Sequence, residues 1–139
     1  MYVKVTKSKF DPSHMVVYME ETDEKYSALK RHFKKHGLAF KQGNFIFFDM
    51  PTIRKNNYDD KNHLTFIEAH EIAHTVLNHT QSSKQIEAEA DFLAVLLCKD
   101  MNYNKSSKLG QSYFRERNGI SFEKFQKMYG KEIYSRISM

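Results

Sequence analysis

The chain has 139 residues, a formal net charge of +5 at pH 7, and 40% hydrophobic and 28% charged residues. A chain of this length buries one modest core, so we expect a single domain over residues 1–139. The longest apolar stretch, Phe92 to Cys98, is far shorter than the roughly 20 residues of a membrane span, and a single cysteine excludes an internal disulfide. With no apolar secretion signal at the N-terminus, we expect a cytoplasmic protein.

The first half of the sequence predicts a small sheet and one helix. Runs of β-branched and aromatic residues favour strands, whereas apolar side chains at helical spacing between a capping threonine and a glycine favour a helix. The predicted strands are 15–19, 38–41 and 44–48, the last two joined as a hairpin, and the predicted helix runs from Thr22 to Gly37. Residues 51–63 are polar, and we expect them to be irregular.

The second half is predicted to be helical. Thr65 with Glu68, and Ser82 with Gln85, have the spacing of capping boxes. The predicted helices are 65–79, one from Ser82 to about Lys99, 107–118 and 121–137. The expected fold class is therefore α+β, with a small antiparallel sheet and helices segregated behind it.

A basic run at Lys30 to His36 carries much of the positive charge. We interpret it as the solvated face and last turn of a helix, where cations favour the negative end of the helix dipole. The alternative is a nucleic-acid-binding surface. One short basic run is a weak signal for such a surface, and we do not expect direct binding to nucleic acid.

The most informative segment is His70-Glu71-Ile72-Ala73-His74. Residues four apart on a helix lie one above the other, so the imidazoles of His70 and His74 point the same way and can bind one metal ion. Glu71 is turned by about 100° around the axis, where its carboxylate can reach a water molecule at the metal rather than the metal itself. We therefore interpret Glu71 as the general base of a metal-assisted hydrolysis.

A third ligand is expected from the next helix, which contains Glu87, Glu89 and Asp91. Glu87 and Asp91 lie on one face, whereas Glu89 is turned by about 200° from Glu87 and should point elsewhere. In an antiparallel helical hairpin, Glu87 and His74 fall at nearly the same height, with room for a metal between axes roughly 8–10 Å apart. Asp91 lies one turn further on, where it can accept the free ring N–H of His70.

Two histidines, one glutamate and an open position are typical of a catalytic zinc site, whereas structural zinc sites use four protein ligands, mostly thiolates. With Cys98 as its one cysteine, a residue we expect in the core, the chain cannot form a thiolate site. We therefore predict one zinc ion per chain, bound by His70, His74 and Glu87. His79 is turned by about 140° from His74 on the predicted helix, and we expect no role for it in the site.

The segments HEIAHTVLNH and EAEADFLAVLL resemble the zinc metallopeptidases of the gluzincin group, and most closely the ImmA/IrrE family. The resemblance covers about residues 44–98. Two departures stand out: Ala73 replaces the usual glycine, and Cys98-Lys99-Asp100 replaces the usual Met-Pro at the end of the second segment. The first is a small-for-small change that we expect to be tolerated.

The resemblance implies a minimal zincin-like domain with peptidase activity. It implies that His70, His74 and Glu87 bind zinc, that Glu71 is the general base and that Asp91 supports a ligand histidine. It also implies cleavage of a specific protein substrate, such as a helix-turn-helix repressor. We expect the enzyme to be bacterial, or to be encoded by a phage or mobile element and to act in the host cytoplasm; the sequence leaves the choice open. The alternative is a catalytically silent module of the same fold that binds a protein partner.

Two further features are expected of a peptidase. A hydrogen-bond donor must stabilise the oxyanion that forms on the substrate, and the candidates are Tyr103, Tyr113 and Arg115. An edge strand can hold an extended substrate by strand addition, and residues 44–49 are the candidate.

Overall fold

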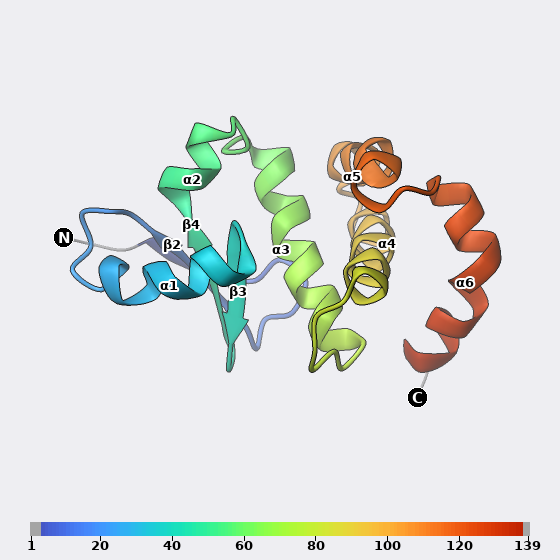
Figure 1. The fold of residues 1–139 in the computed structure, drawn as a ribbon, viewed down its shortest axis with the longest axis horizontal. Helices are drawn as coiled ribbons and strands as arrows, with labels where there is room; N and C mark the ends of the chain where they lie inside the picture. The colour runs from blue at the N-terminus through green and yellow to red at the C-terminus, as the bar shows by residue number, and fades with distance from the viewer. Residues whose placement is uncertain (1–3, 138–139) are drawn as a thin grey trace.

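Residues 4–137 are described by a computed structural model of the chain, and they form a four-stranded sheet and six helices. The sheet with α1 and α2 lies on one side, helices α4, α5 and α6 lie on the other, and α3 runs between them (Figure 1). The elements are β1 (Lys4–Lys7), β2 (Met15–Met19), α1 (Tyr26–His36), β3 (Ala39–Gln42), β4 (Phe45–Asp49), α2 (Met50–Lys55), α3 (Lys61–Val76), α4 (Lys84–Asp100), α5 (Asn104–Asn118) and α6 (Phe122–Ile137). Across the described residues, no helix combines the length and the hydropathy needed to cross a lipid bilayer.

The sheet has the strand order β1-β2-β4-β3. Its outer pairs are antiparallel, whereas the central strands β2 and β4 are parallel, with Val16 opposite Ile46. Parallel neighbours need a long crossover connection, and residues 20–44, which include α1 and β3, supply it. The α+β fold class is confirmed, and the sheet is mixed rather than wholly antiparallel as predicted. Strand β1 was not predicted, because its sequence KVTK is polar and mostly exposed.

Alternate side chains of the central strands pack into two different hydrophobic clusters, one on each face of the sheet. Val16 and Ile46 pack on the side of α2 and α3, in a cluster that includes Ile72. Val17 packs on the other face of the sheet, in a cluster with Phe33 of α1. This division follows from the two-residue period of a strand, which sends successive side chains to opposite faces.

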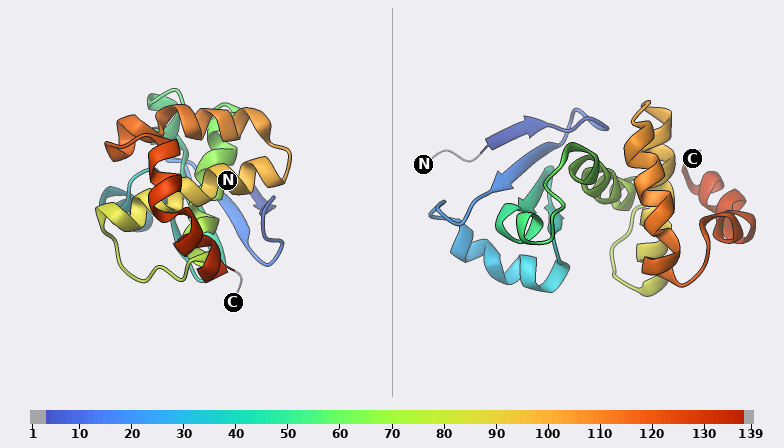
Figure 2. Two further views of the ribbon diagram at one scale, coloured as in Figure 1. Left: turned by 90° about the vertical axis from the view of Figure 1, so that its right-hand side faces the viewer. Right: turned by 90° about the horizontal axis from the view of Figure 1, so that it is seen from above.

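Helix α3 is shared between the sheet and the helical layer. Ile72 packs with the sheet, whereas the next residue, Ala73, packs in the core formed by α4, α5 and α6. The right-hand view of Figure 2 shows α3 between these layers. The facing surfaces of α3 and α4 are lined by fully buried alanines, which allow a close approach: Ala69, Ala73, Ala90 and Ala94. A small residue at position 73 is therefore required by packing.

Residues 51–63 are largely helical and not irregular as we expected. Asp49 caps α2, and Pro51 lies in the first turn of that helix, where its missing N–H costs no hydrogen bond. The side chain of Asp60 accepts from two backbone N–H groups in the first turn of α3, at 3.0 and 3.1 Å. Helix α3 therefore begins at Lys61, and Thr65 lies within it rather than at its cap.

Three helices are each followed, two residues after their last helical residue, by an asparagine in the left-handed region of φ. These are Asn57 after α2 (60°), Asn78 after α3 (55°) and Asn102 after α4 (63°). In each case the N–H of the following residue bonds back to the last helical turn, as His79 does to the carbonyl of His74 at 3.0 Å. This Schellman arrangement brings the residue after the asparagine back beside the helix. As a result α3 ends at Val76, not at His79 as predicted.

Candidate metal centre

Helix α4 packs beside α3 and brings Glu87 to the two histidines of the HEIAH motif. Glu87 Oε1 lies 3.1 Å from His70 Nε2, and Glu87 Oε2 lies 3.5 Å from His74 Nε2. The two Nε2 atoms are 3.1 Å apart. The Glu87 side chain is 42% exposed, so this triangle of three residues is open to solvent on one side.

The spacing of these donor groups is close to that of ligand atoms in a tetrahedral zinc site. Zinc–nitrogen bonds of about 2.0–2.1 Å at tetrahedral angles place two ligand atoms about 3.3 Å apart. The three distances here are 3.1, 3.1 and 3.5 Å, and the two that involve Glu87 end on different oxygens of its carboxylate. His70, Glu71 and His74 also form a group that could hold a metal ion, with one ligand atom of each within 4.8 Å of the others. The donor set and its spacing therefore fit a divalent metal.

Glu71 differs from Glu87 in its contacts. Within residues 4–137 its carboxylate makes no hydrogen bond and no ion pair, although it lies close to the ligand atoms of His70 and His74. Burial raises the pKa of Glu71, and the neighbouring histidines oppose this effect. Glu71 is thus an unpaired carboxylate beside the two histidines of the candidate site.

Asp91 contacts the other ring nitrogen of His70, as predicted. Asp91 Oδ1 lies 2.8 Å from His70 Nδ1, and the aspartate is 1% exposed. Its two oxygens also accept hydrogen bonds from Arg117 (2.8 and 3.2 Å) and from Asn118 (3.0 Å), both at the end of α5. Sequence reasoning missed Arg117 and Asn118, because no motif links α5 to the candidate metal ligands. The buried carboxylate thus has a cation and an amide as partners in addition to the imidazole.

His79 and Glu89, for which we expected no role, lie directly behind His74. His79 Nδ1 is 2.9 Å from His74 Nδ1, and His79 Nε2 is 2.9 Å from Glu89 Oε1. The prediction failed because it placed His79 on the helix, whereas the chain leaves α3 at Asn78 and turns back. The asparagine two residues before the polar run at 80–83 was the signal that could have shown this. Glu89 does point away from Glu87, but into a buried position and not into solvent.

The charges of the site are strongly coupled. Burial alone would lower the pKa of His70, but its contacts with Asp91 and Glu87 raise it to about 10. The same contacts, with those from His74, hold the pKa of Glu87 far below its usual value. Burial favours the neutral form of Asp91, yet His70 and Arg117 lower its pKa to about 2. The site therefore presents two carboxylates that stay ionised near neutral pH and a cation between them.

A cavity of about 320 Å³ opens beside the first half of α3. Ile67, one turn before Glu71, and Arg117, which binds Asp91, both contribute to its wall. The remaining lining is mostly apolar and aromatic: Leu38, Tyr58, His63, Phe66, Leu109, Gly110, Tyr113 and Glu116. The cavity therefore lies about one turn of α3 from Glu71, the candidate metal residues are not part of its lining, and its surface suits an apolar side chain.

The prediction that residues 44–49 form an edge strand is wrong. Strand β4 is central, between β2 and β3, and β3 is the edge strand on this side of the sheet. Strand β3 contacts α3, and its Lys41 acts electrostatically on Glu71. The sheet edge beside the metal centre is thus Ala39–Gln42.

Only one of the three candidate oxyanion donors lies at the cavity. Tyr113 is part of its wall. Tyr103 lies elsewhere, with its ring 5.6 Å from that of Phe10, and Arg115 is not among the lining residues. Cys98 is fully buried in the core as expected, and burial raises the pKa of its thiol to about 12.

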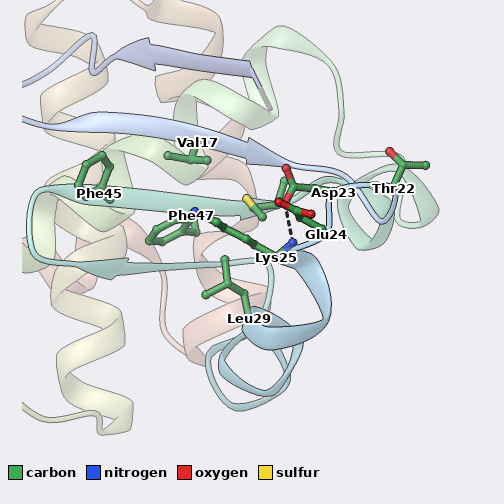
Figure 3. A pocket seen from close by; sticks show the side chains of 9 residues that line it. Val17, Thr22, Asp23, Glu24, Lys25, Leu29, Phe45 and Phe47 are labelled. Carbon is green, nitrogen blue, oxygen red and sulfur yellow. Dashed lines mark hydrogen bonds between the residues drawn. The ribbon is translucent and has the colours of Figure 1, made fainter. Parts of the chain in front are cut away.

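A second hollow, of about 500 Å³, lies on the face of the sheet turned away from α3 (Figure 3). Val17, Phe45 and Phe47 form its apolar floor, and the segment Thr22–Lys25 forms its rim, where the backbone N–H of Lys25 bonds to the Asp23 carboxylate at 2.8 Å. Because successive strand residues face opposite sides, this hollow is separated from the metal centre by the sheet.

The basic run on α1 is exposed, with Lys30, Arg31, Lys34 and Lys35 all facing solvent as we expected.

Comparisons of the chain with protein-family models, with curated proteins and with solved structures find no match. The functional argument therefore depends on the residues of the site.

Proposed function

We propose that the chain is a zinc-dependent metallopeptidase that hydrolyses a peptide bond in a specific protein substrate. The observation that carries the proposal is the triangle of His70, His74 and Glu87, whose edges match a zinc site, with the unpaired carboxylate of Glu71 beside it. The resemblance of the two segments to ImmA/IrrE peptidases supports the same function.

In this proposal His70, His74 and Glu87 would hold the zinc ion. A bound zinc ion would lower the pKa of a water molecule and polarise the scissile carbonyl. Glu71 would take a proton from the attacking water and return it to the leaving amine. Burial raises the pKa of Glu71, which makes this carboxylate a better base and its protonated form easier to reach.

We place the substrate between β3 and α3. An extended peptide could pair with the edge strand β3, where backbone hydrogen bonds supply affinity without sequence preference. One side chain could then enter the 320 Å³ cavity beside α3, whose apolar wall favours an apolar residue. A repressor protein, as the resemblance implies, could present such a segment in a linker.

The experiment compares the wild type with Glu87→Gln and Glu71→Gln. Zinc content is measured by mass spectrometry, and cleavage by the new termini formed in a library of peptides from a bacterial proteome. We expect about one zinc per chain in the wild type and in Glu71→Gln, much less in Glu87→Gln, and cleavage by the wild type alone.

The other outcomes are equally informative. No zinc in folded wild type, purified without chelator, contradicts the metal site. Equal zinc in the wild type and Glu87→Gln contradicts the third ligand. Bound zinc without cleavage of any peptide or protein tested, and with no functional change in Glu71→Gln, would favour the silent partner-binding module.

A further inference from the structure

His74, the second of the two histidines proposed to bind the metal, contacts a chain of buried polar groups. His74 Nδ1 contacts His79 Nδ1 at 2.9 Å, His79 Nε2 contacts Glu89 Oε1 at 2.9 Å, and Arg136 of α6 forms an ion pair with the same oxygen at 2.8 Å. The side chains of His79 and Glu89 are only 6% and 10% exposed. The chain His74–His79–Glu89–Arg136 therefore runs from the metal centre into the C-terminal helix.

The positions of the hydrogen atoms along this chain follow from the geometry. The Nε2 atom of His74 faces His70 and Glu87, so a metal held there leaves Nδ1 as the nitrogen that carries the hydrogen. That hydrogen can be donated only to the Nδ1 lone pair of His79. The hydrogen of His79 must then be on Nε2, where it is donated to the Glu89 carboxylate.

The backbone keeps His79 in place for this contact. Asn78 adopts a φ of 55°, and the N–H of His79 bonds to the carbonyl of His74 at 3.0 Å. His79 is thus bound to the same residue through both its backbone and its ring. Both ring nitrogens are occupied, so His79 itself is not available as a metal ligand.

The Nδ1 atoms of His70 and His74 therefore have different hydrogen-bond partners. His70 donates directly to Asp91, whereas His74 reaches a carboxylate only through a second imidazole. A partner that accepts the free N–H of a ligand histidine fixes its tautomer and makes it a better donor. We propose that His79, held by Glu89, is a positioning residue that orients the metal ligand His74. The inference rests on the proposed zinc site.

The test measures zinc affinity by competition with a chromophoric chelator in the wild type and in His79→Leu and His79→Asn. Leucine has a similar size but cannot accept a hydrogen bond, whereas the Oδ1 atom of asparagine can replace the Nδ1 lone pair. Loss of such a partner costs roughly 10–100-fold in metal affinity. We expect that loss in His79→Leu, recovery of most of the affinity in His79→Asn, and a shifted d–d absorption band in cobalt-substituted His79→Leu.

A matched control and a measurement without mutation complete the test. Gln85→Ala removes a group 3.4 Å from the other oxygen of Glu89 and should leave zinc affinity unchanged. In zinc-loaded wild type, nitrogen-15 spectra should show the hydrogen of His79 on Nε2 and that of His74 on Nδ1.

The failure of this inference is distinguishable from the failure of the zinc site. If the wild type binds no zinc, the proposed site is wrong and this inference falls with it. If the wild type binds zinc but His79→Leu, shown to be folded, binds it within twofold of the wild type, only the role of His79 is overturned. The opposite tautomer of His79 would overturn it without any variant.

Discussion

His70 Nε2 lies 3.1 Å from Glu87 Oε1, although the two residues are 17 positions apart and belong to different helices. The same ring contacts Asp91 through its other nitrogen at 2.8 Å. His70 is thus clamped between two carboxylates of α4, one open to solvent and one buried. This pair of contacts determines how the charge of the proposed metal site changes with pH.

Zinc binding is expected to release a proton. In the metal-free protein, Asp91 and Glu87 raise the pKa of His70 to about 10, so this imidazole is charged at pH 7 and must lose its proton to bind zinc. Zinc affinity should therefore rise with pH, by about tenfold per unit between pH 7 and 9. Calorimetry in buffers of different ionisation enthalpy should show the release of about one proton or more per zinc. Proton-free binding would contradict the geometry of His70.

Asp91→Asn should destabilise the metal-free protein by about 2–3 kcal/mol at pH 7. The pKa of Asp91 falls from 3.8 to about 2 in the folded state, and each unit is worth about 1.4 kcal/mol. Because the folded pKa is the lower one, this stabilisation is present above about pH 4 and is lost as the pH falls towards 2. Urea unfolding with chelator at pH 7, 4 and 3 should show the two proteins converging in acid.

The matched control for Asp91 is Asp59→Asn, a change at an exposed aspartate in the loop before α3. It should leave the free energy of unfolding within about 0.5 kcal/mol of the wild type. A pH-independent difference between the wild type and Asp91→Asn would show that the loss came from packing and not from charge.

Two buried helical glycines should respond oppositely to alanine. At Gly110 a Cβ atom would lie 2.1 Å from Cε1 of Phe66, so the ring must move, at a cost of roughly 1–3 kcal/mol. At Gly130 the nearest atom, Cγ of Gln126, is 3.4 Å away, and alanine should stabilise the helix by up to about 1 kcal/mol. Thermal unfolding of Gly110→Ala and Gly130→Ala tests this. Equal changes in thermal stability in the two variants would mean that the Phe66 ring moves without a cost in free energy.

The end of α3 should depend on Asn78. Its φ of 55° is easy for glycine but costs a β-branched residue roughly 1–2 kcal/mol. Asn78→Gly should therefore retain stability close to that of the wild type, and Asn78→Val should lose about that amount in denaturant unfolding. If Asn78→Val were as stable as Asn78→Gly, the left-handed turn that places His79 beside His74 would be in doubt.

The sequence by itself determined the parts of this protein that depend on local periodicity. The four-residue spacing of His70 and His74, and that of Glu87 and Asp91, put each pair on one helix face whatever surrounds the helices. The α+β class, the strand at 15–19 and the hairpin followed from residue type and turn chemistry in the same way. The contact of Asp91 with His70 was predictable because a short loop forces the two helices to run antiparallel.

Only the tertiary structure decided which groups surround the candidate metal centre. Arg117, Asn118 and Arg136 reach it from α5 and α6, and nothing in their local sequence encodes how those helices pack. The parallel pairing of β2 with β4, which made β3 the edge strand, depends on side-chain packing across the sheet and not on the hairpin itself. The place of His79 was missed because one left-handed residue, Asn78, redirects the chain, and a helical projection that continues past it no longer describes where side chains point.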